Sequence, residues 1–393
     1  MKHRLLMNII LPTIIIGTCT ISVFAKTNRN LSDYVISKPI DLKGSTLTIP
    51  DGRRLFFKKG ARLTNGIIVG NNTSIGGSMI DIFNNVQITG SWNVSHISTA
   101  MFGDMSKNNS LVNVFALTSK NVKNVVTIAP GDYWITISED WRYGLLVVDH
   151  TEIILNGTIR LKPNSFRGYK MFNLSGKNIN LHGFGSVGSV VGDREYHLGA
   201  EGEWGMGINI EAGSEIKICD ISVKNCWGDC IYIGGKATDV QISGCVLDGS
   251  RRQGISITSA GRVYIDDCRI RNIGGTRPGY AIDIEPNENC LVNYVLISNV
   301  RVVDCNGGFM SWHPEKNSHI GTIEILNCSV SGKVEYYDYS FERTDKIVMK
   351  NNIGVGNKIR LSKLNEVLLE NNSIHGQWLS TYTMSDCKIV KRK

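Results

Sequence analysis

Proline is scarce in this chain of 393 residues, with 8 prolines against 41 glycines. Many turn formers and few helix breakers indicate short strands joined by tight turns. Beyond residue 25, the sequence also lacks any apolar run long enough to cross a bilayer. With 42% hydrophobic and 20% charged residues, the composition is that of a folded protein with a sizeable core, which excludes wholesale disorder.

Cysteine pairs with metal-site spacing are absent as well. The ten cysteines form no Cys-x2-Cys pair, and nine remain when Cys19 is set aside. Neither a zinc site nor a disulfide framework is therefore expected. The formal charge is +8, or +6 without Lys2 and Arg4, which suits an acidic polymer. No basic stripe with interleaved aromatics occurs, so nucleic acid is not an expected partner.

Residues 1–25 have the layout of a secretory signal peptide. A basic start at Met1–Arg4 precedes an apolar segment from Leu5 to Ile16, and Val23-Phe24-Ala25 forms a small-residue cleavage site. The apolar segment is short for a membrane span. We therefore expect a secreted, periplasmic or cell-surface protein. Lipidation of Cys19 is the less favoured alternative, because Thr18 is a poor residue to precede it.

One short pattern recurs through most of the chain and predicts the fold. It reads apolar, any, apolar, two polar or small residues, Cys or a substitute, any, apolar. Examples are "VQISGCVL" at Val240, "VYIDDCRI" at Val263, "VLISNVRV" at Val295 and "IEILNCSV" at Ile323. Such a unit cannot bury its inner face alone, so stacked copies must supply the ladder hydrogen bonds and the core. Since Ile and Val dominate and no helical period accompanies each unit, the pattern favours an all-β parallel β-helix over leucine-rich repeats.

The slot filled by cysteine in this pattern is predicted to point inward. Cys245, Cys268 and Cys328 would then form one stack of small buried groups. Asn352 and Asn372 occupy the same slot in later copies, where stacked amides could bond along the axis. We expect the β-helix over residues 106–393, with a short helix from Ser110 to Leu117 capping its open end, and an N-terminal β-rich module over 26–105.

Three segments carry a resemblance to a known superfamily. "TIAPGDYWI" resembles the opening of pectin-lyase-like right-handed parallel β-helix proteins, which include polysaccharide lyases, hydrolases and phage tailspikes. "NCWGDCIYIGG" and "QGISITSAG" are similar to strand-turn motifs of the polygalacturonase family of glycoside hydrolases. The resemblance implies a right-handed coil and a polysaccharide or oligosaccharide substrate, in a protein that is a monomer or a trimer. Gln253 stands where that family has a histidine, which favours a related hydrolase over polygalacturonase itself.

A second set of strands predicts an outer groove. In "MGINIE", "DCIYIG", "QGISIT" and "YAIDIE" the third and fifth residues are apolar, so the fourth residue should point outward. That outward column is predicted to contain Asn209, Tyr232, Ser256 and Asp283. Strands about 4.8 Å apart would make it a groove with sugar-sized steps.

Asp283 and Glu285 are the predicted catalytic pair. Their Cα atoms would lie about 6.6 Å apart on one strand face, and glycosidases need two carboxyl groups about 5–9.5 Å apart. Like charges this close would raise the pKa of one of them. The competing interpretation is that both pair with nearby arginines. Asp229 matches the aspartate before the strand where the polygalacturonase family places a catalytic acid, and its alternative is a turn residue that caps backbone N–H groups.

The remaining predicted site residues bind substrate. Arg251 and Arg252 are expected to hold an anionic group, because a guanidinium fork binds carboxylates bidentately. The others are Gln253, Tyr232, Trp204, His197 and Glu203. The last three lie in or at the end of a long insertion before the strand at Met206, and insertions on a solenoid usually line its binding face. Beyond the strand at Tyr280, Trp312 and His313 are expected to close the other end of the groove.

Calcium binding and two further functions stay open. Asp193, Glu201 and Glu203 could supply oxygen ligands to calcium, but without a known calcium-loop spacing no metal or other cofactor is expected. The leading hypothesis is a glycoside hydrolase that acts on an acidic, uronate-containing or sulfated polysaccharide. The alternatives are a polysaccharide lyase or uronate epimerase on the same scaffold, and a non-catalytic glycan-binding β-helix.

Overall fold

The computed structural model describes residues 33–106, 110–184, 188–200, 203–314, 316–354 and 358–374, together with the backbone of four short strands at Ile14–Ile16 (β1), Cys19–Ile21 (β2), Gln377–Leu379 (β39) and Lys388–Arg392 (β40). The expected signal peptide falls outside the described residues except for the backbone of β1 and β2. Helix α1, at seven residues, is far too short to cross a membrane, and no other described helix is long and apolar enough to do so.

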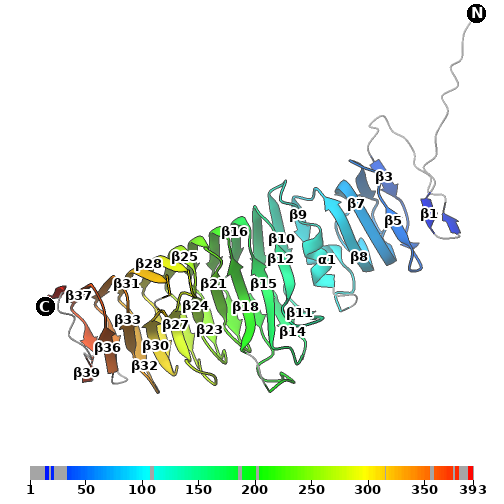
Figure 1. The fold of residues 1–393 in the computed structure, drawn as a ribbon. Helices are drawn as coiled ribbons and strands as arrows, with labels where there is room; N and C mark the ends of the chain where they lie inside the picture. The colour runs from blue at the N-terminus through cyan, green and yellow to red at the C-terminus, as the bar shows by residue number, and fades with distance from the viewer. Residues whose placement is uncertain are drawn as a thin grey trace, which may run out of the picture. The chain divides into compact units, whose positions relative to one another are not determined.

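The chain divides into two compact units, Met1–Asn124 and Val125–Lys393 (Figure 1). The first unit is built on β7, which pairs in parallel with β4, β5, β6 and β8, while β6 also pairs with β3. Its elements are β3 (Asp33–Ile36), β4 (Ile40–Asp41), β5 (Thr46–Thr48), β6 (Arg54–Phe57), β7 (Leu63–Gly77), β8 (Phe83–Trp92), β9 (His96–Ser98), the 3-10 helix η1 (Thr99–Met101) and α1 (Ser110–Ala116). The predicted helix is therefore present. The Asn113 side chain ties it to β8, accepting from Ile88 N at 2.8 Å and donating to Val86 O at 2.9 Å.

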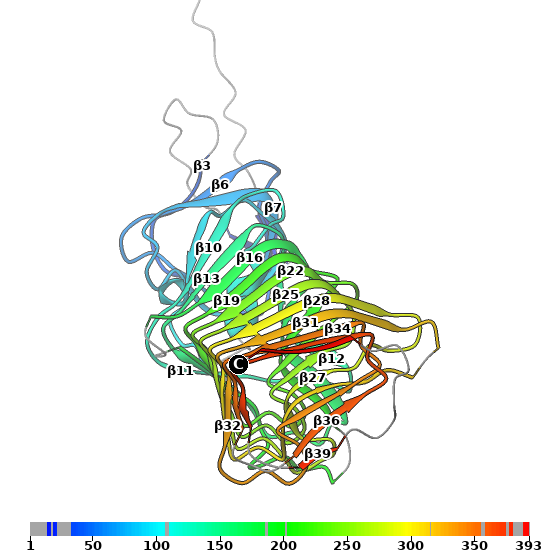
Figure 2. The same ribbon diagram turned by 90° about the vertical axis from the view of Figure 1, so that its left-hand side faces the viewer.

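The second unit is a parallel β-helix with three sheets, as the repeat predicted (Figure 2). The first sheet stacks β10 (Asn124–Ile128), β13 (Thr151–Leu155), β16 (Lys177–His182), β19 (Ser214–Cys219), β22 (Thr238–Ser243), β25 (Ala260–Asp266), β28 (Leu291–Ser298), β31 (His319–Leu326), β34 (Lys346–Lys350), β37 (Glu366–Glu370) and β40. The second sheet stacks β11 (Asp132–Ile135), β14 (Thr158–Leu161), β17 (Ser189–Val191), β20 (Ser222–Lys224), β23 (Val246–Asp248), β26 (Arg269–Arg271), β29 (Arg301–Val303), β32 (Ser329–Ser331), β35 (Ile353–Gly354) and β38 (Ser373–Ile374).

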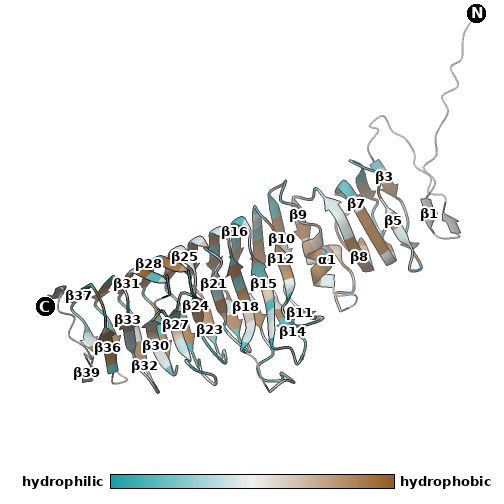
Figure 3. Ribbon diagram, viewed as in Figure 1, coloured by the Kyte–Doolittle hydropathy of each residue, from teal (hydrophilic) through white to brown (hydrophobic). Residues whose placement is uncertain are grey.

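The third sheet contains the strands on which the groove was predicted. It stacks β12 (Arg142–Val147), β15 (Gly168–Leu174), β18 (Trp204–Glu211), β21 (Ile231–Gly234), β24 (Ile255–Ile257), β27 (Tyr280–Ile284), β30 (Gly307–Ser311), β33 (Tyr339–Glu342), β36 (Lys358–Ser362) and β39. Apolar and polar residues alternate along these strands (Figure 3). Their inward members, such as Ile208, Ile231, Ile255 and Ile282, are fully buried, so each turn of the coil adds a layer to one continuous core.

The turn between the first two sheets explains the recurring pattern. The second of its two polar or small residues has a positive φ, for example +62° at Gly244, +46° at Asp267 and +56° at Asn327. Left-handed backbone of this kind favours Gly, Asn and Asp. The turn directs the next residue inward, and Cys245, Cys268 and Cys328 are accordingly buried free thiols, as predicted.

Asparagine replaces cysteine in this slot toward the end of the coil and bonds along the axis, as predicted. Asn352 is fully buried. Its Oδ1 accepts from Cys328 N at 2.9 Å, and its Nδ2 donates to Ile325 O at 2.8 Å. Asn372 repeats the arrangement one turn later, where its Oδ1 accepts from Asn352 Nδ2 at 2.9 Å. The buried amides are thus satisfied by neighbouring coils.

Candidate active site on the third sheet

The outward column on the third sheet has the predicted register. Asn209 pairs with Tyr232, Tyr232 with Ser256, and Ser256 with Asp283. Since the flanking Ile282 and Ile284 are core residues, Asp283 points away from the core. It is nevertheless only 1% exposed, and Asp229 is 0% exposed. The two aspartates therefore form a buried layer beneath the surface of the groove, which the sequence did not indicate.

Arg252 is the centre of the site. It lies at the turn before β24, where its Nη1 contacts Asp229 Oδ2 at 3.3 Å and its Nε lies 3.8 Å from Glu203 Oε2. Burial acts to lower the pKa of Arg252, but the combined charges of Asp229, Asp283, Glu203 and Glu285 outweigh it, so the pKa is raised. Four acids around one guanidinium leave the cluster with an excess of negative charge whenever all of them are ionised. We call these five residues the acid cluster.

Gln253 bridges the two buried aspartates. Its backbone N donates to Asp229 Oδ1 at 3.1 Å, and its side-chain Nε2 donates to Asp283 Oδ2 at 2.6 Å. Its Oε1 accepts from Tyr280 N at 2.6 Å. Ser256 adds a donor to Asp229 Oδ2 at 2.7 Å. Gln253 was predicted to bind substrate, but it is 0% exposed, so it instead positions the acids.

Asp283 and Glu285 are close enough for each to affect the pKa of the other. Burial, and then the charge of Glu285, raise the pKa of Asp283 well above its ordinary value. Burial also raises the pKa of Glu285, against the opposing effects of Arg252 and of a hydrogen bond from the Asp283 carboxyl. Two carboxyl groups joined by a hydrogen bond cannot both be ionised at low cost. The pair therefore retains one proton at a pH where isolated carboxyl groups have lost theirs.

The other acids and the tryptophan take different positions around Arg252. Asp229 is paired with Arg252, and burial raises its pKa to about 6. Glu203 has a side chain that is 34% exposed, so it meets solvent directly. The Arg252 guanidinium lies 5.1 Å from the centre of the Trp204 ring, and that ring lies 6.3 Å from Trp141. The predicted Trp204 and Glu203 thus join the predicted acids on one face.

Arg251 and His197 lie outside the acid cluster. Arg251 stacks over Trp227 at 4.0 Å, and Trp227 stacks on His197 at 3.9 Å. The His197 side chain is 0% exposed, and its Nδ1 lies 2.7 Å from Asp193 Oδ2. His197 was predicted to bind substrate, but it is sealed inside the insertion. Tyr232 remains in the outward column, where its hydroxyl accepts from Thr258 Oγ1 at 2.8 Å.

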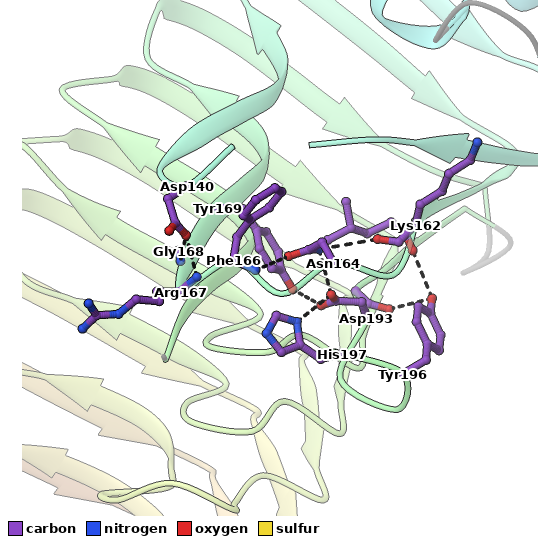
Figure 4. A network of polar contacts seen from close by, with 12 residues as sticks. Asp140, Lys162, Asn164, Phe166, Arg167, Gly168, Tyr169, Asp193, Tyr196 and His197 are labelled. Atoms are coloured by element: carbon purple, nitrogen blue, oxygen red, sulfur yellow. Dashed lines mark hydrogen bonds and ion pairs between the residues drawn. The ribbon is translucent and has the colours of Figure 1, made fainter. Parts of the chain in front are cut away.

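Asp193 organises the insertion that leads into β18. It accepts hydrogen bonds from Asn164 Nδ2 at 2.8 Å and from the Tyr169 hydroxyl, in addition to its contact with His197 (Figure 4). These partners use both of its oxygens, which argues against a role as a calcium ligand. Glu201, the second expected ligand, lies outside the described residues.

Asp229 makes stability depend on pH. Its pKa rises from 3.8 to about 6 because burial disfavours the charged form, with Arg252, Ser256 and Gln253 N opposing the rise. The folded state therefore binds this proton more tightly than the unfolded state. The contribution to the free energy of unfolding is fully present below about pH 4 and is lost as the pH rises toward about 6, and it amounts to about 3 kcal/mol.

We expect Asp229→Asn to remove this dependence, since asparagine does not titrate. Urea unfolding of both proteins at about pH 4 and about pH 7 measures it. The wild type should lose up to about 3 kcal/mol relative to the variant between the two pH values. Parallel pH dependences would contradict the assignment.

Comparisons with known proteins agree with the fold. Residues 206–389 match the family described as right handed beta helix region, which confirms the predicted hand. The chain is 32% identical over 181 residues to the uncharacterized protein YclG of Bacillus subtilis (strain 168), a match that covers 40% of this chain and 30% of YclG. The uncharacterized protein YorA, from the SPbeta prophage of the same strain, is 24% identical over 166 residues, 36% of this chain and 28% of YorA. The chain thus spans less than a third of the length of either relative.

Solved structures show the same likeness. The endo-xylogalacturonan hydrolase from Aspergillus tubingensis has a TM-score of 0.49 at 12% identity, over 76% of this chain and 98% of that chain. A rhamnogalacturonan lyase has a TM-score of 0.44 at 13% identity, over 75% of this chain and 87% of that chain. The match of residues 206–389 confirms the right-handed parallel β-helix that the resemblance implied. At 12–13% identity, the likeness to these two solved structures does not identify a reaction.

Proposed function

We propose that the protein is a glycoside hydrolase that cleaves an acidic polysaccharide on the outer face of its third sheet. The observation that supports this most strongly is the acid cluster. Asp229 and Glu203 lie within 3.3 and 3.8 Å of the Arg252 guanidinium, and the nearby carboxyl groups of Asp283 and Glu285 have raised pKa values because they are buried. Clustered carboxyl groups with raised pKa values are typical of sites that move protons.

The Asp283–Glu285 pair acts as the general acid. The two carboxyl groups are close enough to affect each other's pKa, whereas the acid and base of a glycosidase lie about 5–9.5 Å apart on opposite sides of the bond. The pair therefore fills one of the two roles and not both, which modifies the role expected from the sequence. Glu285 is the more exposed partner, so it contacts the glycosidic oxygen, and Asp283 is its positioning residue.

Glu203 supplies the second carboxylate. It approaches Arg252 from the turn before β18, whereas Asp283 lies on β27, and its exposed side chain can hold a water molecule. The water oxygen bonds to the anomeric carbon while its proton passes to Glu203. The glycosidic C–O bond breaks, and its oxygen takes the proton from the Asp283–Glu285 pair. Asp229 positions Arg252, and Trp204 offers an aromatic face for sugar packing.

Hydrolysis and elimination are distinguished by their products. We expect purified protein to release new reducing ends from at least one polysaccharide in a panel containing polygalacturonate, xylogalacturonan, alginate and chondroitin sulfate. No ultraviolet absorbance from an unsaturated sugar should accompany that release. Appearance of the unsaturated product would favour a lyase. Binding without turnover by a folded protein would favour a non-catalytic glycan-binding β-helix.

Residues 1–25 direct export in this proposal. The substrates in the panel are extracellular polymers, so export places enzyme and substrate on the same side of the membrane. Processing after Ala25, read from the N-terminal residue of protein recovered outside the cell, tests this part.

A further inference from the structure

The third sheet has a second polar feature that the sequence pattern did not indicate. A pocket of about 320 Å³ lies beside β27, β30, β33 and β36, and its wall includes Arg277, Tyr280, Met310, Trp312, Tyr336 and Arg360. This volume is within the range of small-molecule sites. Met310 pairs with Asp283, so the pocket begins one strand, about 4.8 Å, beyond the acid cluster.

Aromatic rings shape this pocket. Tyr280 and Tyr336 are stacked, with ring centres 6.2 Å apart and planes 25° apart. The Tyr280 ring lies over Gly307, where a Cβ atom would come within 2.4 Å of it. Glycine at position 307 is therefore required for the close approach that forms the wall. Flat aromatic faces of this kind pack against the apolar face of a sugar ring.

The charge of the pocket is opposite to that of the acid cluster. Arg277 lies over Tyr336 at 5.9 Å, and among the residues that the structure describes no carboxylate forms an ion pair with it. Arg360 pairs with Glu342 at 2.7 Å, but Glu342 is shared with Arg343 at 3.8 Å. The pocket wall thus contains two guanidinium groups, those of Arg277 and Arg360, and one carboxylate, that of Glu342, so the excess charge is positive.

The acid cluster has an excess of negative charge and the pocket has an excess of positive charge, so the pocket is better suited to hold an anionic group of the substrate. The sequence predicted that Arg251 and Arg252 hold the anionic group of the substrate. Arg252 instead contacts Asp229 and Glu203, with Asp283 and Glu285 near enough to affect its pKa, and Arg251 is stacked on Trp227. A sugar anion placed at Arg252 would meet a net negative field, whereas one placed at Arg277 would meet a net positive field.

We propose that this pocket binds one anionic sugar residue of the polysaccharide, next to the bond that is cleaved, and that Arg277 recognises its carboxylate or sulfate group. The inference rests on the proposed function for the position of the bond, but binding itself does not depend on cleavage. The Arg277 guanidinium donates to the oxyanion, and Tyr336 packs against the ring. A neutral sugar would still pack against Tyr336 but would lack the ionic contact with Arg277.

The test measures binding in the Glu285→Gln background, so that no substrate is consumed. The probes are hexagalacturonate, its neutral carboxyl-reduced counterpart, and a κ-carrageenan hexasaccharide that carries sulfate but no carboxylate. Calorimetric titration should show that at least one charged probe binds more tightly than the neutral probe, with the difference shrinking as salt increases. The two charged probes distinguish a carboxylate from a sulfate.

Arg277→Ala should weaken binding of the preferred charged probe by about 10- to 100-fold and leave the neutral probe unchanged. Tyr336→Ala should weaken both. The matched control is Arg269→Ala, which removes an exposed arginine from β26 on the second sheet and should change neither. Equal binding of charged and neutral probes, no binding of either charged probe, or an equal loss in Arg269→Ala would overturn the inference. Tight anion binding without cleavage by the wild type would refute the proposed function alone.

Discussion

Glu285→Gln is expected to lower kcat by about 10²–10⁴-fold, the usual contribution of a general acid. Glutamine keeps the shape of the side chain but cannot deliver a proton to the glycosidic oxygen. KM should change little, because Glu285 acts mainly when the bond breaks. The measurement is the rate of reducing-end release from the preferred polysaccharide, with circular dichroism to verify the fold.

Glu288→Gln is the matched control for this prediction. It makes the same chemical change three residues further on, where Glu288 is exposed and paired with Lys316 at 2.7 Å. Its kcat should equal that of the wild type. If Glu285→Gln retains full activity in a correctly folded protein, the assignment of the acid is wrong.

Asp283→Asn separates a positioning role from a merely structural one. The buried Asp283 raises the pH at which the pair gives up its last proton, so its removal should shift the basic limb of the kcat profile to lower pH. A uniform loss of activity at every pH, with no shift, would mean that Asp283 only supports the fold.

Asp193→Ala should produce the largest loss of stability, about 3–5 kcal/mol, because it leaves buried polar partners without an acceptor. Asp193 is fully buried and serves Asn164, Tyr169 and His197. Without it, His197 loses the contact that orients its ring against Trp227. Urea unfolding followed by tryptophan fluorescence measures the change.

The control for this prediction is Asp132→Ala, which breaks an exposed ion pair with Arg160 at 2.8 Å. Exposed pairs contribute about 0–1 kcal/mol, so its effect should be small. If the two variants lost similar amounts of unfolding free energy, the hydrogen bonds of Asp193 would contribute no more to stability than an exposed ion pair.

The repeating sequence pattern was sufficient to predict the β-helix, the buried cysteine slot and the direction of the outward column. These features follow from the alternation of side chains along a strand and from a turn that admits only a few residue types. For example, the alternation around Asp283 predicted its direction correctly. It could not predict its burial, because burial depends on long side chains such as Gln253, which reaches Asp283 from the preceding turn of the coil.

Residues between the strands were harder to place. His197 resembled a groove residue in the sequence, yet its contacts with Asp193 and Trp227 are set by the path of an irregular insertion. The pocket at Tyr336 was missed for a similar reason, because its wall combines β-strand residues with the connection before β33. Trp312, which was predicted to close the end of the groove, lies in this wall, and the adjacent tyrosines at 336 and 337, in a connection otherwise rich in polar residues, were a second signal.

The asparagines at the end of the coil have a consequence for misfolding. A slip of one residue between coils would turn the Asn352 amide outward and away from Cys328 N and Ile325 O, so two main-chain groups would lose their present partner. An aliphatic residue in that slot would tolerate many alignments, whereas the amide accepts one. Asn352 and Asn372 therefore favour the native register of the last coils, which have the fewest neighbouring strands to hold them in place.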